Sequence, residues 1–208
     1  MRKENKKNLN TKEYWDNFFK EDRFQKKHSW RVGPYHRAVE ALNEAGLGID
    51  NCTVLDVGCA FGDGLQYLDS KYKNLKLIGF DYSEEAIIWA AQKYKDNKNY
   101  SFYVDDIYNM KEVNVDIIII AETLEHLEND NQVLEKLKRQ CRILIVTVPN
   151  NEIKNNKDLH KMHVNSYTKD SFKGAFVTTG EADDYLVAIY INNKKNDDSY
   201  LESERILI

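Results

Sequence analysis

Five short apolar segments, most of them separated by segments with helical spacing, constrain the fold of this 208-residue chain more than any other feature. One of them holds four consecutive isoleucines, Ile117–Ile120, between Asp116 and Glu122. Such continuous apolar runs are typical of strands buried on both faces, as in parallel sheets covered by helices. The strands are predicted at residues 52–58, 75–81, 100–106, 115–122 and 142–150.

The intervening segments predict helices at residues 35–48, 62–73, 83–95 and 129–140. Ser83 is a plausible N-cap for the third, with Glu84 and Glu85 in its first turn, where the helix dipole favours acids. Residues 168–176 are a further helix candidate. Residues 176–180 and 184–191 are expected to pair as a closing antiparallel hairpin. The predicted fold class is therefore α/β: a Rossmann-like three-layer sandwich with a mostly parallel seven-stranded sheet ending in that hairpin.

Composition excludes several classes of protein. The net charge of −4 argues against non-specific nucleic-acid binding, and no apolar run approaches the length that crosses a bilayer. Cys52, Cys59 and Cys141 lack the spacing of a zinc cluster or a disulfide framework, and the basic N-terminal stretch lacks the apolar part of a signal peptide. We therefore expect a cytoplasmic protein that makes no membrane contact.

The positive charge is unevenly distributed. Residues 1–37 carry eleven Lys and Arg against five Asp and Glu, and residues 151–173 carry five against three. These segments are either solvated surface or surfaces that face an anionic acceptor.

A glycine-rich loop, LDVGCAFGDG at Leu55–Gly64, follows the first predicted strand. In an open α/β sheet this position lies at the carboxyl edge, where ligands bind. The dinucleotide fingerprint counted from Gly58 would need glycines where Ala60 and Asp63 stand, and no Lys-Ser/Thr follows as in a P-loop. A pyrophosphate site is thus poorly supported.

The pattern Asp56-x-Gly58-x-Ala60-x-Gly62 resembles motif I of the class I S-adenosylmethionine-dependent methyltransferases, with Ala60 in place of the middle glycine. IGFDYSEEAI, FYVDDI, AETLEHL and VTVPN resemble the family's later strand motifs in order, and the resemblance covers residues 50–172. It implies S-adenosylmethionine as cofactor, with Asp81 on the ribose hydroxyls, Asp106 on the adenine amino group and Ile107 beside the ring. The cofactor contacts that it implies are Asp56, Gly58, Ala60, Gly62, Asp81, Tyr82, Asp106, Ile107 and Ala121.

Strand-end acids support this expectation independently. Acidic residues end four successive predicted strands, at Asp56, Asp81, Asp105/Asp106 and Glu122. A row of carboxylates along one edge is costly without a compensating ligand, and the cofactor offers a sulfonium, an ammonium and hydroxyl donors. The resemblance divides a single domain, 1–208, into an N-terminal cap (1–45), a cofactor-binding core (50–150) and an acceptor-side insert with the closing hairpin (151–208).

The catalytic candidates follow the fourth strand. His126 is the expected base, with Glu125 beside it, because imidazole exchanges protons near neutral pH. The expected acceptor contacts are Tyr14, Trp15, Trp30, Arg31 and His163.

Three interpretations of these residues remain open. The first is a methyltransferase acting on a small-molecule acceptor at O or N, as a monomer or homodimer, with no metal. The second rests on the E-x-x-E-H pattern of Glu122, Glu125 and His126, which with His160 or His163 resembles the metal site of small-RNA 2′-O-methyltransferases. A non-catalytic S-adenosylmethionine-binding protein is a third possibility.

Overall fold

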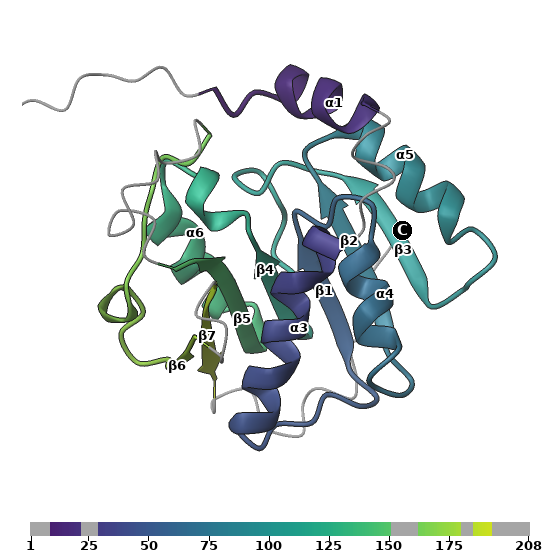
Figure 1. Ribbon diagram of the computed structural model, residues 1–208. Helices are drawn as coiled ribbons and strands as arrows, with labels where there is room; N and C mark the ends of the chain where they lie inside the picture. The colour runs from purple at the N-terminus through teal and green to yellow at the C-terminus, as the bar shows by residue number, and fades with distance from the viewer. Residues whose placement is uncertain (1–8, 22–28, 151–161, 180–184, 193–208) are drawn as a thin grey trace, which may run out of the picture.

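A computed structural model describes residues 9–21, 29–150, 162–179 and 185–192 (Figure 1). The described strands form one seven-stranded sheet with the order β3-β2-β1-β4-β5-β7-β6. The pairs among β1 to β5 are parallel, whereas β7 runs antiparallel to both β5 and β6, as the sequence predicts. The strands are β1 (Thr53–Val57), β2 (Lys76–Asp81), β3 (Tyr100–Val104), β4 (Val115–Ala121), β5 (Cys141–Pro149), β6 (Phe176–Thr178) and β7 (Tyr185–Ile191).

The isoleucine run lies at the centre of the sheet in β4 and serves both faces. Ile118 and Ile120 pack in a core with α6 (Asp130–Lys138), and Ile117 and Ile119 pack in a second core with α3 (Ser29–Glu44) and α4 (Asp63–Asp69). Side chains alternate across a strand, so four consecutive apolar residues supply two to each core. The molecule thus has the three layers that the sequence predicts.

Two helices differ in extent from the prediction. α3 begins at Ser29 rather than Tyr35 and contains Pro34, and α4 ends at Asp69. α5 (Glu84–Lys93) agrees closely: Ser83 caps it by accepting a hydrogen bond from the backbone N–H of Ala86. A further helix, α1 (Lys12–Lys20), begins at the cap residue Thr11 and crosses the top of the sheet beside α5 (Figure 1).

The prediction of a helix at residues 168–176 is wrong. Only the three-residue 3₁₀ turn η2 (Lys169–Ser171) forms there. Thr168 and Ser171 cap each other's backbone, and Gly174 has a left-handed φ of 81°. These local bonds satisfy the backbone without a longer helix and turn the chain toward β6.

The helices in the described part of the chain include none with the length and apolar character needed to cross a membrane.

Candidate functional site

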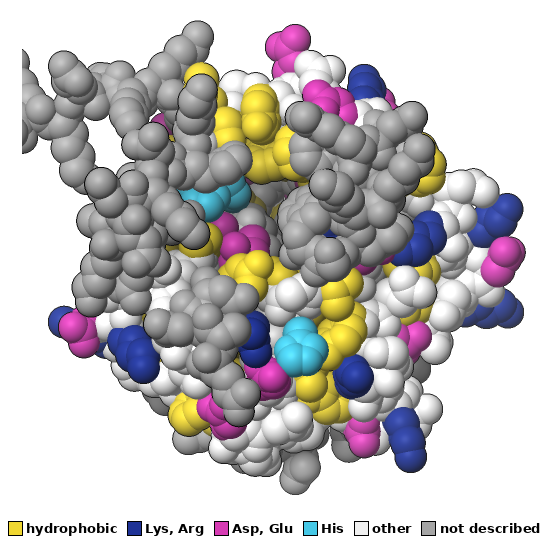
Figure 2. Space-filling view, viewed as in Figure 1, with side chains coloured by type: hydrophobic (Ala, Val, Ile, Leu, Met, Phe, Trp, Pro, Cys, Tyr) yellow, Lys and Arg dark blue, Asp and Glu magenta, His cyan; other side chains and the backbone are white. Residues whose placement is uncertain are grey.

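A cavity of about 930 Å³ lies at the carboxyl ends of β1, β2 and β4. The chain order in the sheet reverses between β1 and β4, which is where open α/β sheets bind ligands. α1 and α3 cover the cavity, and η1 (Leu124–His126) and His163 close one end. Figure 2 shows this face hollowed at its centre, with histidine and acidic side chains beside hydrophobic ones. The volume is near the upper end of the range for small-molecule sites.

The glycine loop is shaped by close packing. Gly58 has a left-handed φ of 77°, and a Cβ there would lie 2.4 Å from the hydroxyl oxygen of Thr123. Gly64 opens α4 beneath the ring of Tyr35, where a Cβ would lie 2.1 Å from a ring carbon. Side chains at these positions would displace the cavity wall, so both positions require glycine for packing, and Gly58 requires it for its backbone conformation as well.

Asp81 ends β2 with its carboxylate at the cavity. One oxygen accepts the backbone N–H of Ala60 at 2.9 Å and the other that of Ser83 at 2.9 Å. Burial raises the pKa of Asp81 to about 6, against the lowering effect of these bonds. A carboxylate has about four lone-pair sites, so Asp81 keeps acceptor capacity for a ligand.

Asp56 lies behind the wall rather than at the cavity surface. Its carboxylate is fully buried, and its two oxygens share the single hydrogen of the Tyr35 hydroxyl, whose oxygen lies 2.9 and 2.7 Å from them. Burial raises its pKa to about 7 even though the tyrosine bond lowers it. Gly62 also lies behind the cavity lining: its carbonyl accepts the Tyr94 hydroxyl at 3.1 Å.

The remaining expected cofactor contacts surround the cavity. Tyr82, Asp106, Ile107 and Ala121 all line it, as do Gly58 and Ala60. Asp106 is anchored by accepting the backbone N–H of Tyr108 at 3.0 Å.

Helix α1 is fixed over the cavity by contacts with the start of α5. Asp16 accepts the Ser83 hydroxyl at 2.6 Å and the backbone N–H of Glu85 at 3.4 Å. Lys12 and Lys20 add ion pairs to the first turn of α5, with Glu84 and Glu85. Asp16 therefore acts as an additional cap of α5 that is supplied by another helix.

Two of the expected acceptor contacts, Tyr14 and Trp15, point from α1 into the cavity lining. Arg31 also lines it, but its guanidinium pairs with Asp63 at 2.6 Å, with both side chains buried. The side chain of Trp30 and the whole of His160 lie outside the described residues.

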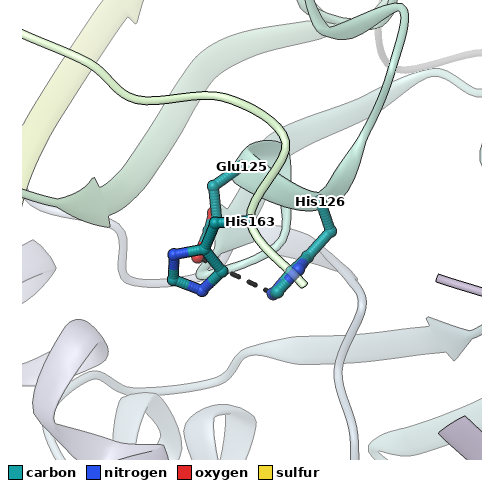
Figure 3. Close-up of side chains that lie close together, drawn as sticks. All are labelled: Glu125, His126 and His163. Carbon is teal, nitrogen blue, oxygen red and sulfur yellow. Dashed lines mark ion pairs between the residues drawn. The ribbon is translucent and has the colours of Figure 1, made fainter. Parts of the chain in front are cut away.

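Glu125, His126 and His163 form a cluster at one end of the cavity (Figure 3). His126 Nε2 lies 3.9 Å from a carboxylate oxygen of Glu125, and the two imidazole rings have centroids 4.8 Å apart. His126 Nδ1 lies 3.1 Å from the carbonyl oxygen of Met162. Because a carbonyl oxygen only accepts, Nδ1 carries the hydrogen, and Nε2 is the acceptor nitrogen of the neutral ring.

One ligand atom from each member of this cluster lies within 4.8 Å of the others, so the residues have the chemistry of metal ligands. Around one zinc ion, donor atoms at ~2.1 Å would lie about 3.4 Å apart, closer than this spread. Glu122 lines the same cavity but is outside the cluster.

Sequence reasoning missed several lining residues. Asn10 donates to the carbonyls of His126 and Met162, at 3.2 and 2.8 Å, and so joins the segment before α1 to the cluster. Phe18 and Phe19 lie one turn beyond Tyr14 and Trp15, and the i, i+4 spacing could have identified them.

Comparisons with known proteins agree with this geometry. Residues 49–203 match the family described as Methyltransferase domain. Phosphoethanolamine N-methyltransferase of Plasmodium falciparum is 28% identical over 152 residues, which cover 69% of this chain and 55% of that protein. A protein of Mycoplasma genitalium named for tRNA methyltransferase activity is 35% identical over 63 residues, 30% of this chain and 29% of its own. The chain thus spans about half or less of these curated relatives.

A solved N-methyltransferase of Bradyrhizobium japonicum, in complex with S-adenosyl-L-homocysteine, shares the fold. It has a TM-score of 0.63 and 20% identity, over 88% of this chain and 99% of that one. The family match, the sheet order and the cavity at the switch point lead to one conclusion: this chain belongs to the class I S-adenosylmethionine-dependent methyltransferases.

Proposed function

We propose that the chain transfers the methyl group of S-adenosylmethionine to a small-molecule acceptor at oxygen or nitrogen. The observation that carries this proposal is one cavity that extends from the Asp81 carboxylate to the imidazole of His126. The family's cofactor fits the first end, and the acceptor fits the second.

The cofactor end has groups suited to the adenosine part. Asp81 has acceptor capacity for ribose hydroxyls, and its partly desolvated carboxylate makes such bonds stronger than in water. Asp106 provides an acceptor for the adenine amino group, with the buried side chain of Ile107 nearby in sequence. The backbones of Gly58, Ala60 and Ala121 allow close approach of the methionine part. Asp56 supports the loop from behind rather than touching the ligand.

When bound, S-adenosylmethionine supplies an electrophilic methyl group and a thioether that leaves without charge. The protein then needs chiefly to align the acceptor, since positioning accounts for much of such catalysis. Trp15 packs edge-on against His126 with centroids 5.1 Å apart, which fixes both the ring and the wall of the acceptor end. His126 Nε2 is the group that would remove the acceptor proton, and Glu125 would stabilise the imidazolium.

The decisive experiment measures transfer from methyl-labelled S-adenosylmethionine to a panel of small amines, alcohols and phenols. We expect labelled product from at least one class. His126→Ala should reduce turnover by about 10²–10⁴-fold, the usual contribution of a general base, with unchanged S-adenosylhomocysteine affinity. Full activity in this variant would refute the catalytic role, and absence of cofactor binding by the wild-type chain would refute the function.

A second candidate is the metal-dependent methylation of RNA 2′-hydroxyls, which the Glu125–His126–His163 cluster favours. Turnover that is lost on exhaustive chelation and restored by one divalent ion would support it, as would RNA binding that weakens with salt. The spread of the three ligand atoms makes it the less favoured of the two.

A further inference from the structure

The acceptor end of the cavity, defined here as Tyr14, Trp15, Glu125, His126 and His163, combines aromatic rings with a carboxylate. The ring of Trp15 packs edge to face with the rings of Tyr14 and His126, with centroid distances of 5.2 and 5.1 Å. Phe18, also at the lining, packs on Trp15 at 5.3 Å. Adjacent rings of this kind present electron-rich faces, which attract cations.

The charge of the lining favours the same kind of occupant. Among the described residues, the lining carries one arginine, Arg31, and that guanidinium is already paired with a carboxylate. It carries six carboxylates, of which Asp63 is already paired with both Arg31 and Lys93; the other five are Asp81, Asp105, Asp106, Glu122 and Glu125. The methyl donor accounts for part of this negative charge, because it is a cation overall. Glu125, the acid of the acceptor end, would repel a phosphate or carboxylate acceptor and attract an ammonium.

The tautomer of His126 suits an ammonium acceptor. Its Nδ1–H donates to the carbonyl of Met162, so Nε2 is set to receive a proton rather than to give one. Glu125 lies 3.9 Å from this nitrogen and would stabilise the imidazolium that forms. A protonated amine cannot be methylated until it loses a proton, so the acceptor end has the base that such a substrate requires.

We propose that the acceptor is a small primary or secondary amine that enters as its ammonium ion; this rests on the proposed methyltransferase function. The amine proton passes to His126 Nε2, and the nitrogen lone pair then forms the new N–C bond. The electrons of the broken C–S bond stay on sulfur, and the imidazolium proton leaves to solvent. The product is again a cation, held by the same rings and by Glu125.

The test uses a matched pair of probes that differ in charge alone. Choline carries a quaternary nitrogen, and 3,3-dimethylbutan-1-ol has carbon in its place. Affinities are measured by calorimetry on the chain saturated with S-adenosylhomocysteine. We expect choline to bind at least tenfold more tightly than the neutral alcohol. Equal affinities, or no choline binding to the S-adenosylhomocysteine complex, would overturn the amine proposal and leave the methyltransferase proposal standing.

Substitutions at the acceptor end test whether choline binds there. Trp15→Leu and Glu125→Gln should each weaken choline binding at least fivefold while S-adenosylhomocysteine affinity, which reports on the fold, stays within twofold. The matched controls are Trp89→Leu, a half-exposed tryptophan on α5, and Glu128→Gln, an exposed acid beside η1, and both should leave choline binding unchanged. If the controls weaken binding as much as the site variants, the assignment to the acceptor end is wrong. If the wild-type chain fails to bind S-adenosylhomocysteine, the proposed function fails, and the amine inference fails with it.

Discussion

Tyr35→Phe removes one hydroxyl from the interior and should destabilise the protein by an amount that depends on pH. The Tyr35 hydroxyl contacts both oxygens of Asp56, which is fully buried with a pKa of about 7. At pH 8 the bond goes to a carboxylate, and charged-group hydrogen bonds contribute about 1.5–3 kcal/mol. At pH 6 most of Asp56 is protonated, and a neutral bond contributes about 0.5–1.5 kcal/mol.

Urea denaturation at pH 6 and pH 8 measures both losses. Tyr100→Phe is the matched control, because its hydroxyl donates to the partly exposed Asp69 at 2.9 Å, where water can replace it. We expect a small loss for the control that is the same at both pH values. If Tyr35→Phe gives equal losses at pH 6 and pH 8, Asp56 does not titrate in this range, and the reasoning from its burial is wrong.

Four further predictions follow from the same geometry. Asp81→Asn should weaken S-adenosylhomocysteine binding about tenfold to hundredfold by calorimetry, since charge-assisted bonds to the ribose are lost; unchanged affinity would remove Asp81 from that role. In the wild type, burial raises the pKa of Asp81 to about 6, and ribose donors favour the ionised form. Affinity should therefore fall as pH drops below 6, and a flat profile from pH 5 to 8 would contradict this. Thermal-shift assays should show stabilisation by S-adenosylhomocysteine and none by NAD or ATP. Gly64→Ala should lower the melting temperature because its Cβ meets the Tyr35 ring, whereas Gly46→Ala, where space is open, should cost only backbone strain.

The sheet was predictable because its determinants are local. The four consecutive isoleucines of β4 indicate a strand that is buried on both faces, and Ser83 indicates where α5 begins. The glycine loop could likewise be placed at the carboxyl edge from its position after β1 alone. At residues 168–176, by contrast, the composition is compatible with a helix. The chain forms a single turn there, stabilised by the reciprocal hydrogen bonds of Thr168 and Ser171.

The support of the site could not be predicted because it depends on pairs that are distant in sequence. Asp56, in β1, resembles a ligand-binding acid by motif, and nothing local indicates that the hydroxyl of Tyr35, from α3, contacts both of its oxygens. The position of α1 depends on Asp16 meeting Ser83, 67 residues away. In each case the sequence identifies a polar residue that needs a hydrogen-bond partner. Which residue becomes that partner depends on the tertiary packing.

Ser83 has a consequence for how cofactor binding and the docking of α1 depend on each other. Its backbone N–H holds Asp81, and its hydroxyl holds Asp16 of the covering helix. A ligand on Asp81 and the docking of α1 therefore share one residue, and any preference of one for the other must be reciprocal. If cofactor binding steadies this residue, α1 docks more firmly and completes the acceptor end. Asp16→Ala, which loosens the docking of α1, should therefore also weaken cofactor binding, by the same factor by which bound cofactor strengthens that docking.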